Sequence, residues 1–200
     1  MRKAGVVLGL IPKVLINLVT EAHGPQTALE IKCRAGCEDV SDFRINEVYG
    51  DETWRKLVAA TAEVLGLSGD RLEEEYARYF LRDAQKRWPA WFQMSKTARE
   101  FLERHPAVHN NFADAVRDSA SRAQIKDKFR VEKLDDKIIT HYRSPNRHCY
   151  LYVSLAREVL SLYREDATIE EPKCMKRGDP ECEIWISWSP CERNDNVQQF

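Results

Sequence analysis

Apolar side chains recur at intervals of three and four residues through the first two-thirds of the chain, which is the spacing of an amphipathic helix. The first run extends from Leu10 to Val19 and stops at His23-Gly24-Pro25, because glycine and proline end helices. A second helix is predicted to begin near Glu52, with Asp51 as its cap, since a carboxylate accepts hydrogen bonds from the open N–H groups of a first turn. Further helices are predicted over residues 68–80, 96–104 and 107–119.

The period changes near Ala123, where polar and apolar residues begin to alternate as they do in strands. The strands predicted in this way cover residues 128–132, 137–142, 167–174 and 182–188, and an amphipathic helix from Cys149 to Tyr163 separates the two pairs.

This order of elements predicts an α+β fold, with a helical N-terminal part followed by a small antiparallel sheet with a packed helix. We expect one domain over residues 1–188, helical over 1–120 and α/β over 125–188, and then a polar tail over 189–200.

The amino-acid composition argues against several classes of function for this chain, namely nucleic-acid binding, membrane binding and membrane spanning. The 200 residues include 31 Lys and Arg against 32 Asp and Glu, so no overall basic field favours nucleic acid or an anionic membrane. The longest apolar stretch, residues 4–20, is interrupted by Pro12, Lys13 and Asn17 and is shorter than the roughly 20 apolar residues of a membrane span. Without a recognisable secretion signal, the six cysteines are expected to be thiols or metal ligands in a cytoplasmic protein.

Three of these cysteines are expected to meet in space. A hairpin around Gly178 would bring Cys174 and Cys182 together, and Cys149 opens the helix that precedes it. With Glu171, three thiolates make the four donors of a structural Zn²⁺ site, because zinc prefers soft thiolates in a closed tetrahedron. His148 and Cys191 are alternative fourth ligands, and three unlinked reduced thiols are the alternative to a metal site.

Two further segments contain side chains that could bind a cofactor or an anion. His109 lies on a predicted helix among apolar residues, and a neutral imidazole is a common heme-iron ligand, although a single histidine is more often structural. The segment from His141 to Arg147 has hydroxyls and two guanidinium groups that suit carboxylates or phosphates, or it is a solvated turn. No glycine-rich phosphate loop, nucleophile elbow or paired-carboxylate motif is found, so the chain is not expected to be an enzyme.

Together these features resemble the heme nitric oxide/oxygen binding (H-NOX) domains, the gas-sensing module of soluble guanylate cyclase and of stand-alone bacterial sensors. The resemblance runs from about Val6 to Trp188. It rests on Gly9-Leu10-Ile11 in the first helix, Tyr49-x-Asp51, Phe101-Leu102 eight residues before His109, and Tyr142-x-Ser144 thirteen residues after Phe129.

The resemblance implies a heme b cofactor with His109 on the iron. It assigns the propionates to Tyr142, Ser144 and the neighbouring positions Asn146 and Arg147, and the distal pocket to Leu10, Ile11 and Tyr152. In this family a tyrosine hydroxyl over the iron favours oxygen. Tyr150, Leu151 and Tyr152 all lie near that position, so the register is open between them.

The cysteine set also resembles the zinc site of some bacterial H-NOX proteins, through Cys149, Cys174-Met175 and Cys182-Glu183. The spacing Glu171-x2-Cys174-x7-Cys182 is similar to that of the 4-vinyl reductase domains, in which the glutamate and the cysteines bind zinc.

The resemblance implies a cytoplasmic heme-based sensor of nitric oxide, with oxygen as the other candidate gas, that signals to a separate effector such as a histidine kinase or a diguanylate cyclase. Two departures support an alternative. Asn146 stands where the family has the arginine of its Tyr-x-Ser-x-Arg motif, and Asp127 stands where it has a proline. The alternative is a heme-free sensor on the same fold, which binds a small molecule or responds to thiol oxidation at the zinc site.

Overall fold

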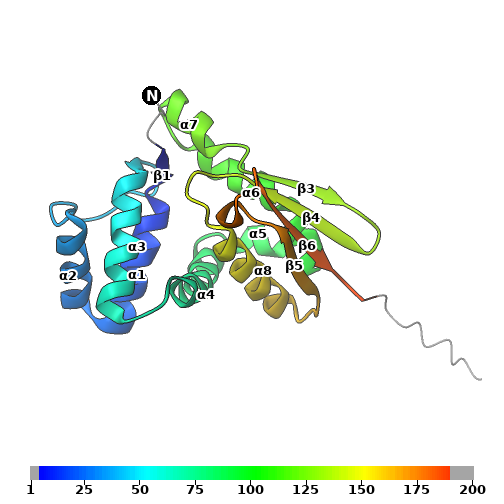
Figure 1. The fold of residues 1–200 in the computed structure, drawn as a ribbon, viewed down its shortest axis with the longest axis horizontal. Coiled ribbons are helices and arrows are strands. Elements are labelled where there is room, and N and C mark those ends of the chain that lie inside the picture. The colour runs from blue at the N-terminus through cyan, green and yellow to red at the C-terminus, as the bar shows by residue number, and fades with distance from the viewer. Residues whose placement is uncertain (1–4, 190–200) are drawn as a thin grey trace, which may run out of the picture.

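The computed structural model of the protein describes residues 5–189, and Cys191 and most of the predicted polar tail lie outside this range. The N-terminal part forms a group of helices with a two-stranded sheet at one end (Figure 1). Its elements are β1 (Val6–Leu8), α1 (Leu10–His23), α2 (Pro25–Ala35), β2 (Val48–Gly50) and α3 (Asp51–Leu65).

The C-terminal part combines five helices with a four-stranded antiparallel sheet of order β3-β4-β6-β5. Its helices are α4 (Gly69–Arg87), α5 (Pro89–Gln93), α6 (Ala98–Asp114), α7 (Ser119–Ile125) and α8 (Cys149–Tyr163), and a short 3-10 turn covers Met175–Arg177. Its strands are β3 (Phe129–Lys133), β4 (Lys137–Tyr142), β5 (Thr168–Lys173) and β6 (Cys182–Ser187). The predicted α+β class is confirmed.

Two local predictions differ from the structure, and one pair of strands was not predicted. The predicted break near residue 105 is wrong, because α6 continues through Pro106. Proline removes one N–H and strains the preceding turn, but the packing of α6 on α8 and β3 holds the helix together. The predicted Asp51 cap is also wrong, since α3 begins at Asp51 itself and Gly50 takes the cap position. The paired strands β1 and β2 were not predicted, because three residues are too few to show an alternating pattern.

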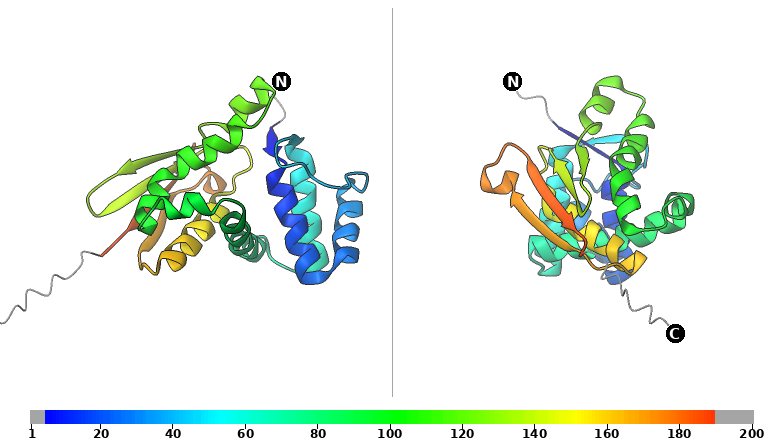
Figure 2. Two further views of the ribbon diagram at one scale, coloured as in Figure 1. Left: turned by 180° about the vertical axis from the view of Figure 1, so that it is seen from behind. Right: turned by 90° about the vertical axis from the view of Figure 1, so that its right-hand side faces the viewer.

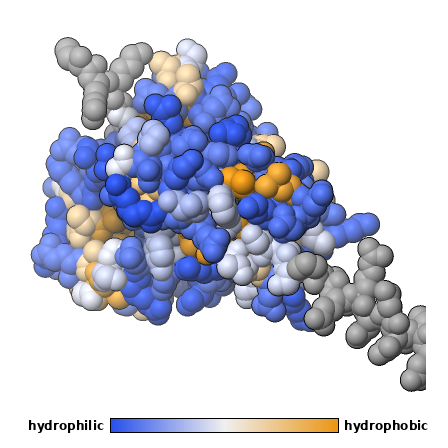
Figure 3. Space-filling view, turned by 45° about the vertical axis from the view of Figure 1, so that its right-hand side comes forward, coloured by the Kyte–Doolittle hydropathy of each residue, from blue (hydrophilic) through white to orange (hydrophobic). Residues whose placement is uncertain are grey.

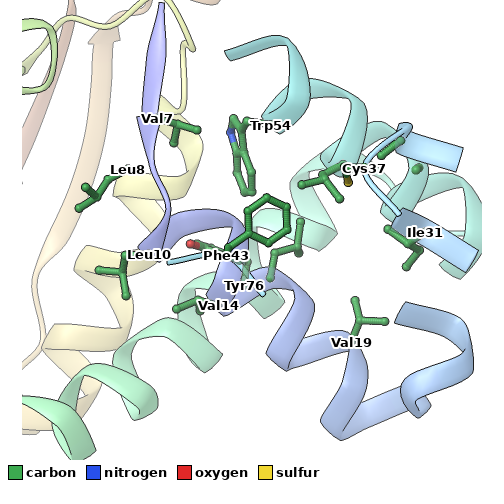
Figure 4. Packing of buried hydrophobic residues seen from close by; sticks show 14 of the residues in the cluster. Val7, Leu8, Leu10, Val14, Val19, Ile31, Cys37, Phe43, Trp54 and Tyr76 are labelled. Atoms are coloured by element: carbon green, nitrogen blue, oxygen red, sulfur yellow. The ribbon is translucent and has the colours of Figure 1, made fainter. Parts of the chain in front are cut away.

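Buried apolar side chains form two separate clusters. The first contains Leu10, Val14, Phe43 and Trp54 together with other residues of β1, α1, α2 and α3 (Figure 4). The second joins α6 and α8 to one face of the four-stranded sheet. Helix α4 spans both, with Leu72 and Tyr76 in the first cluster and Leu81 in the second. Figure 2 shows the same division, with α1 to α3 standing beside the half that contains the sheet.

The face of the molecule shown in Figure 3 is mostly hydrophilic, with only small hydrophobic patches. Within residues 5–189, no helix has the length and apolar character needed to cross a membrane.

The start of α6 offers a test of local helix stability. The Thr97 hydroxyl accepts a hydrogen bond from the backbone N–H of Glu100 at 3.1 Å and satisfies one of the open donors of the first turn. We expect Thr97→Ala to lower the free energy of unfolding by about 1 kcal/mol in urea denaturation, because this cap is lost. Thr97→Ser, which keeps the hydroxyl, is expected to stay near wild type, and an equal loss in both variants would show that the cap is not the cause.

Candidate functional site

A cavity of about 200 Å³ lies between the two hydrophobic clusters. Side chains of both clusters line it, and most of them are aliphatic or aromatic. The first cluster contributes Leu10, Trp54 and Tyr76, and the second contributes Phe101, Leu102 and Tyr142. The few polar lining groups are therefore the ones that decide what the cavity can hold.

Two histidines of α6 form part of one wall. His105 and His109 lie one turn apart on the same helix face, with ring centroids 6.3 Å apart. Both rings meet the ring of Phe129, at 4.5 Å and 5.0 Å between centroids. Because Phe129 in turn stacks on Tyr142 at 4.8 Å, this wall continues from α6 into β3 and β4.

Both imidazoles are neutral and incompletely bonded. The Nδ1 atoms of His105 and His109 are buried and have no hydrogen-bond partner in the described part of the chain. Burial lowers the pKa of His105 to about 3 and the pKa of His109 to about 4, and the nearby charge of Lys128 adds to the effect on His109. A neutral imidazole keeps a lone pair free, which is the form that binds a metal ion.

The opposite wall comes from α1. Leu10 and Ile11 line the cavity, as the resemblance implies for the distal pocket, and Leu151 packs against the same cluster. Tyr152 instead belongs to the second cluster and contacts His105 at 5.2 Å between ring centroids. Tyr152 thus lines the cavity beside the two histidines, and its assignment to the distal pocket stays a prediction.

The tyrosine hydroxyls near these walls already have protein partners. The hydroxyl of Tyr150 donates to Glu74 at 2.5 Å, and that of Tyr152 lies 2.7 Å from the Thr140 hydroxyl. Tyr76 donates to the carbonyl oxygen of Ile11 at 3.1 Å. Leu151 of α8, which lines the cavity and packs against the first cluster, presents an apolar side chain instead.

The segment after β4 borders the cavity through three of the predicted residues, Tyr142, Ser144 and Asn146. Tyr142 and Ser144 are buried, and the Ser144 hydroxyl accepts a hydrogen bond from the Asn146 backbone at 3.3 Å. Arg147 is exposed, has a left-handed φ of 51° and does not line the cavity. The structure therefore does not bring Arg147 to the place that the sequence interpretation gave it.

His148 belongs to the cavity and not to the cysteine cluster. Its Nε2 accepts a hydrogen bond from Trp54 Nε1 at 2.6 Å, and its Nδ1 donates to Glu73 at 3.1 Å. These two bonds fix a neutral tautomer and join the N-terminal helices to the start of α8. Its alternative role as a zinc ligand is excluded by this orientation. Sequence reasoning missed the Trp54–His148–Glu73 network because its members are far apart in the chain.

The predicted cysteine set does meet in space. One donor atom each from Cys149, Glu171, Cys174 and Cys182 lies within 4.8 Å of the others, and the Cys149 and Cys174 sulfurs are 3.3 Å apart. The three cysteines are buried free thiols, and Glu171 Oε1 is buried without a hydrogen-bond partner among the described residues. Burial raises the pKa of the Cys149 and Cys182 thiols. Such a set of soft and charged donors can hold a tetrahedral metal ion.

Comparison of the sequence with known protein families identifies one family that matches most of the chain. The profile of the family described as Haem-NO-binding (HNOB) matches residues 8–171 of this chain. The soluble guanylate cyclase gcy-37 of Caenorhabditis elegans is 30% identical over 94 residues, which is 46% of this chain. The match spans only 13% of the length of that curated relative.

Solved structures share the fold at low sequence identity. An H-NOX protein from S. oneidensis in the Fe(II) state, a triple mutant, superimposes with a TM-score of 0.79 and 15% identity, and the match covers 94% of this chain and 98% of that one. An oxygen-binding H-NOX domain related to soluble guanylate cyclases, in its oxygen complex, has a TM-score of 0.74 and 16% identity over 92% of this chain and 96% of that one. These similarities establish the H-NOX fold.

Proposed function

This chain belongs to the Haem-NO-binding family, and we propose on that basis that it is a sensor that binds heme b in the cavity and nitric oxide at the iron. The observation that carries the proposal is His109, whose neutral imidazole lines an apolar cavity and whose buried Nδ1 has no hydrogen-bond partner among the described residues. A heme iron supplies the open coordination position at which a diatomic gas binds.

The residues around the cavity fit a porphyrin. Aromatic and aliphatic side chains from both clusters offer flat apolar contacts, and Tyr142 and Ser144 offer hydroxyls at one edge. The volume of about 200 Å³ is below the roughly 300–1,000 Å³ of ordinary ligand sites. We therefore expect the two clusters to move apart when the cofactor enters, with α4 and α6 as helices that contribute to both.

The proposal favours nitric oxide over oxygen. Bound oxygen is held by a hydrogen-bond donor over the iron, and the wall formed by Leu10, Ile11 and Leu151 presents aliphatic groups. The tyrosine hydroxyls of Tyr76 and Tyr150 are engaged by Ile11 and Glu74. Nitric oxide binds without such a donor, so the composition of this wall supports it as the ligand.

The output is proposed to pass to a separate effector in the cytoplasm, with a histidine kinase or a diguanylate cyclase as candidates, and the chain itself is proposed to be non-catalytic. Helix α6, which carries His109, packs on α7, α8 and β3. A displacement of His109 therefore reaches both the surface helix α7 and the sheet, where a partner can detect it.

We also propose that Cys149, Glu171, Cys174 and Cys182 bind a structural Zn²⁺. The support is geometric, because the four donors lie within 4.8 Å of one another although they come from α8, from β5, from the turn after β5 and from β6. Cys182 pairs with Tyr142 in the sheet, so an ion here would also fix the start of the segment that borders the cavity.

The volume of the cavity and the identity of residue 146 support a second candidate function. A cavity of about 200 Å³ accepts a small apolar molecule without any movement of its walls, and Asn146 does not supply the positive charge of the family arginine. The alternative is thus a heme-free sensor of a small molecule, or of thiol oxidation at the cysteine cluster.

Absorption spectra of the purified protein supplied with hemin separate the two functions. We expect a Soret band in the ferric and dithionite-reduced states, a shift of that band on addition of nitric oxide, and no stable change of the reduced spectrum in air-equilibrated buffer beyond reoxidation. The apolar wall around Leu151 is the reason for the last expectation. A folded protein that gives no Soret band would exclude the heme sensor, and a stable oxygen complex would contradict the selectivity.

A further inference from the structure

We propose that Lys128 is the cation that binds a heme propionate in this protein, in the role that Asn146 leaves without a charge. This inference rests on the proposed function, since it concerns how the same cavity holds heme.

The first support is the charge of the cavity lining. Among the described side chains that line the cavity, Lys128 is the one lysine or arginine, and no aspartate or glutamate accompanies it. Arg147 and Arg143 are exposed and lie outside the lining. A dianionic porphyrin placed in this cavity would therefore meet a single permanent positive charge.

The second support is the state of the amine itself. Burial lowers the pKa of Lys128, and Asp51 is the one acid whose charge counteracts this effect. No hydrogen bond or ion pair of the Lys128 amine is found within residues 5–189. The Lys128 side chain is half-buried, and an ammonium group in this position without an ion pair among the described residues favours an anionic partner.

The third support is the position of Lys128 between the helix that contains His109 and the segment that follows β4. Lys128 follows Asp127, whose left-handed φ of 57° turns the chain just before β3. Asn110, the residue after His109, holds that turn through two hydrogen bonds to Asp127 of 3.1 and 3.2 Å. On the other side, the Lys128 carbonyl oxygen accepts a hydrogen bond of 2.9 Å from the Arg143 backbone.

These contacts tie Lys128 to both parts of the proposed heme site. One set connects this turn to the helix that carries the proposed iron ligand, and the other connects Lys128 to Arg143, the residue between Tyr142 and Ser144 in the sequence. The charge of Lys128 is also close enough to lower the pKa of His109. A carboxylate that reaches the hydroxyls of this segment would therefore lie near the amine, where a charge-assisted hydrogen bond is strong.

The test compares two porphyrins in equilibrium titrations at pH 7, hemin and hemin dimethyl ester, which lacks the propionate charges. We expect Lys128→Met to weaken hemin binding by about 10- to 100-fold, the range for a lost hydrogen bond to a charged group, and to leave the dimethyl ester affinity within about twofold of wild type. Lys128→Arg is expected to restore most of the hemin affinity. Arg147→Met, which removes an exposed charge outside the lining, serves as the matched control and should change neither titration.

The possible results distinguish a failure of the proposed heme function from a failure of the role proposed for Lys128. If wild type binds neither porphyrin, the proposed heme function fails and this inference fails with it. If wild type binds both and Lys128→Met binds hemin as tightly as wild type, or loses both porphyrins equally, the inference alone is overturned. Circular dichroism of each variant confirms that it is folded, which is expected because the Lys128 amine makes no bond in the structure.

Discussion

Replacing His109 by glycine is expected to weaken hemin binding by at least about 100-fold, because loss of an outer-sphere partner alone reduces metal affinity by 10–100-fold and His109 is the proposed ligand itself. The remaining heme is expected to have an altered Soret band. Titration of hemin into wild type and variant, followed by absorbance and by quenching of tryptophan fluorescence, measures the change. Trp54 and Trp91 line the cavity and report on its occupancy.

His105 provides the matched control. It lies one turn away on the same wall, its Nδ1 is equally buried and unbonded, and it contacts the same Phe129 ring. His105→Leu is expected to leave the ferrous spectrum and its response to nitric oxide unchanged, while added imidazole should restore a histidine-like spectrum to His109→Gly. If His105→Leu lost heme and His109→Gly kept it, the ligand would be assigned to the wrong histidine.

The second large effect is expected at the cysteine cluster. Cys182→Ser should reduce the zinc content of protein purified under reducing conditions from about one equivalent to less than one tenth, as measured by mass spectrometry of the metal. We also expect the free energy of unfolding to fall by about 3–4 kcal/mol. An ion present at a thousand times its Kd contributes about 4.1 kcal/mol, and the serine leaves a hydroxyl that is a poorer ligand.

Cys37→Ala is the control for this experiment. Cys37 is also a buried free thiol, but it lies in the first hydrophobic cluster and not in the proposed metal site. Its replacement should leave the zinc content unchanged. Wild-type protein with no zinc under these conditions would rule out the metal site and leave three buried thiols as the correct description.

The sequence predicted those features that depend on a long run of one pattern. Helix α8 begins at Cys149 and ends at Tyr163 as expected, because a single apolar face continues through it. The bounds of α1 also agree, since Gly24 has a φ of 88° that favours glycine at the end of the helix. The approach of Cys174 and Cys182 followed from the hairpin between β5 and β6, and Cys149 reaches them from the start of α8.

Other features could not be read from a pattern, because they depend on where a single side chain points. Successive residues of a helix are about 100° apart, so Leu151 and Tyr152 face different clusters although both were candidates for one wall. Similarly, Lys128 lies beside the cavity after the turn at Asp127, and the alternating pattern of its segment did not single it out. The contact of His148 with Trp54 links residues 94 positions apart.

The division of the core into two clusters also determines how the fold responds to an empty or a filled cavity. Each cluster buries its own side chains, so the helices α1 to α3 and the half that contains the sheet can behave as two cooperative units joined through α4 and α6. A ligand that touches both walls adds contacts across this boundary and couples the two units into one. Occupancy of the cavity would then be communicated as a change in the cooperativity of the whole protein, in addition to any displacement of a single helix.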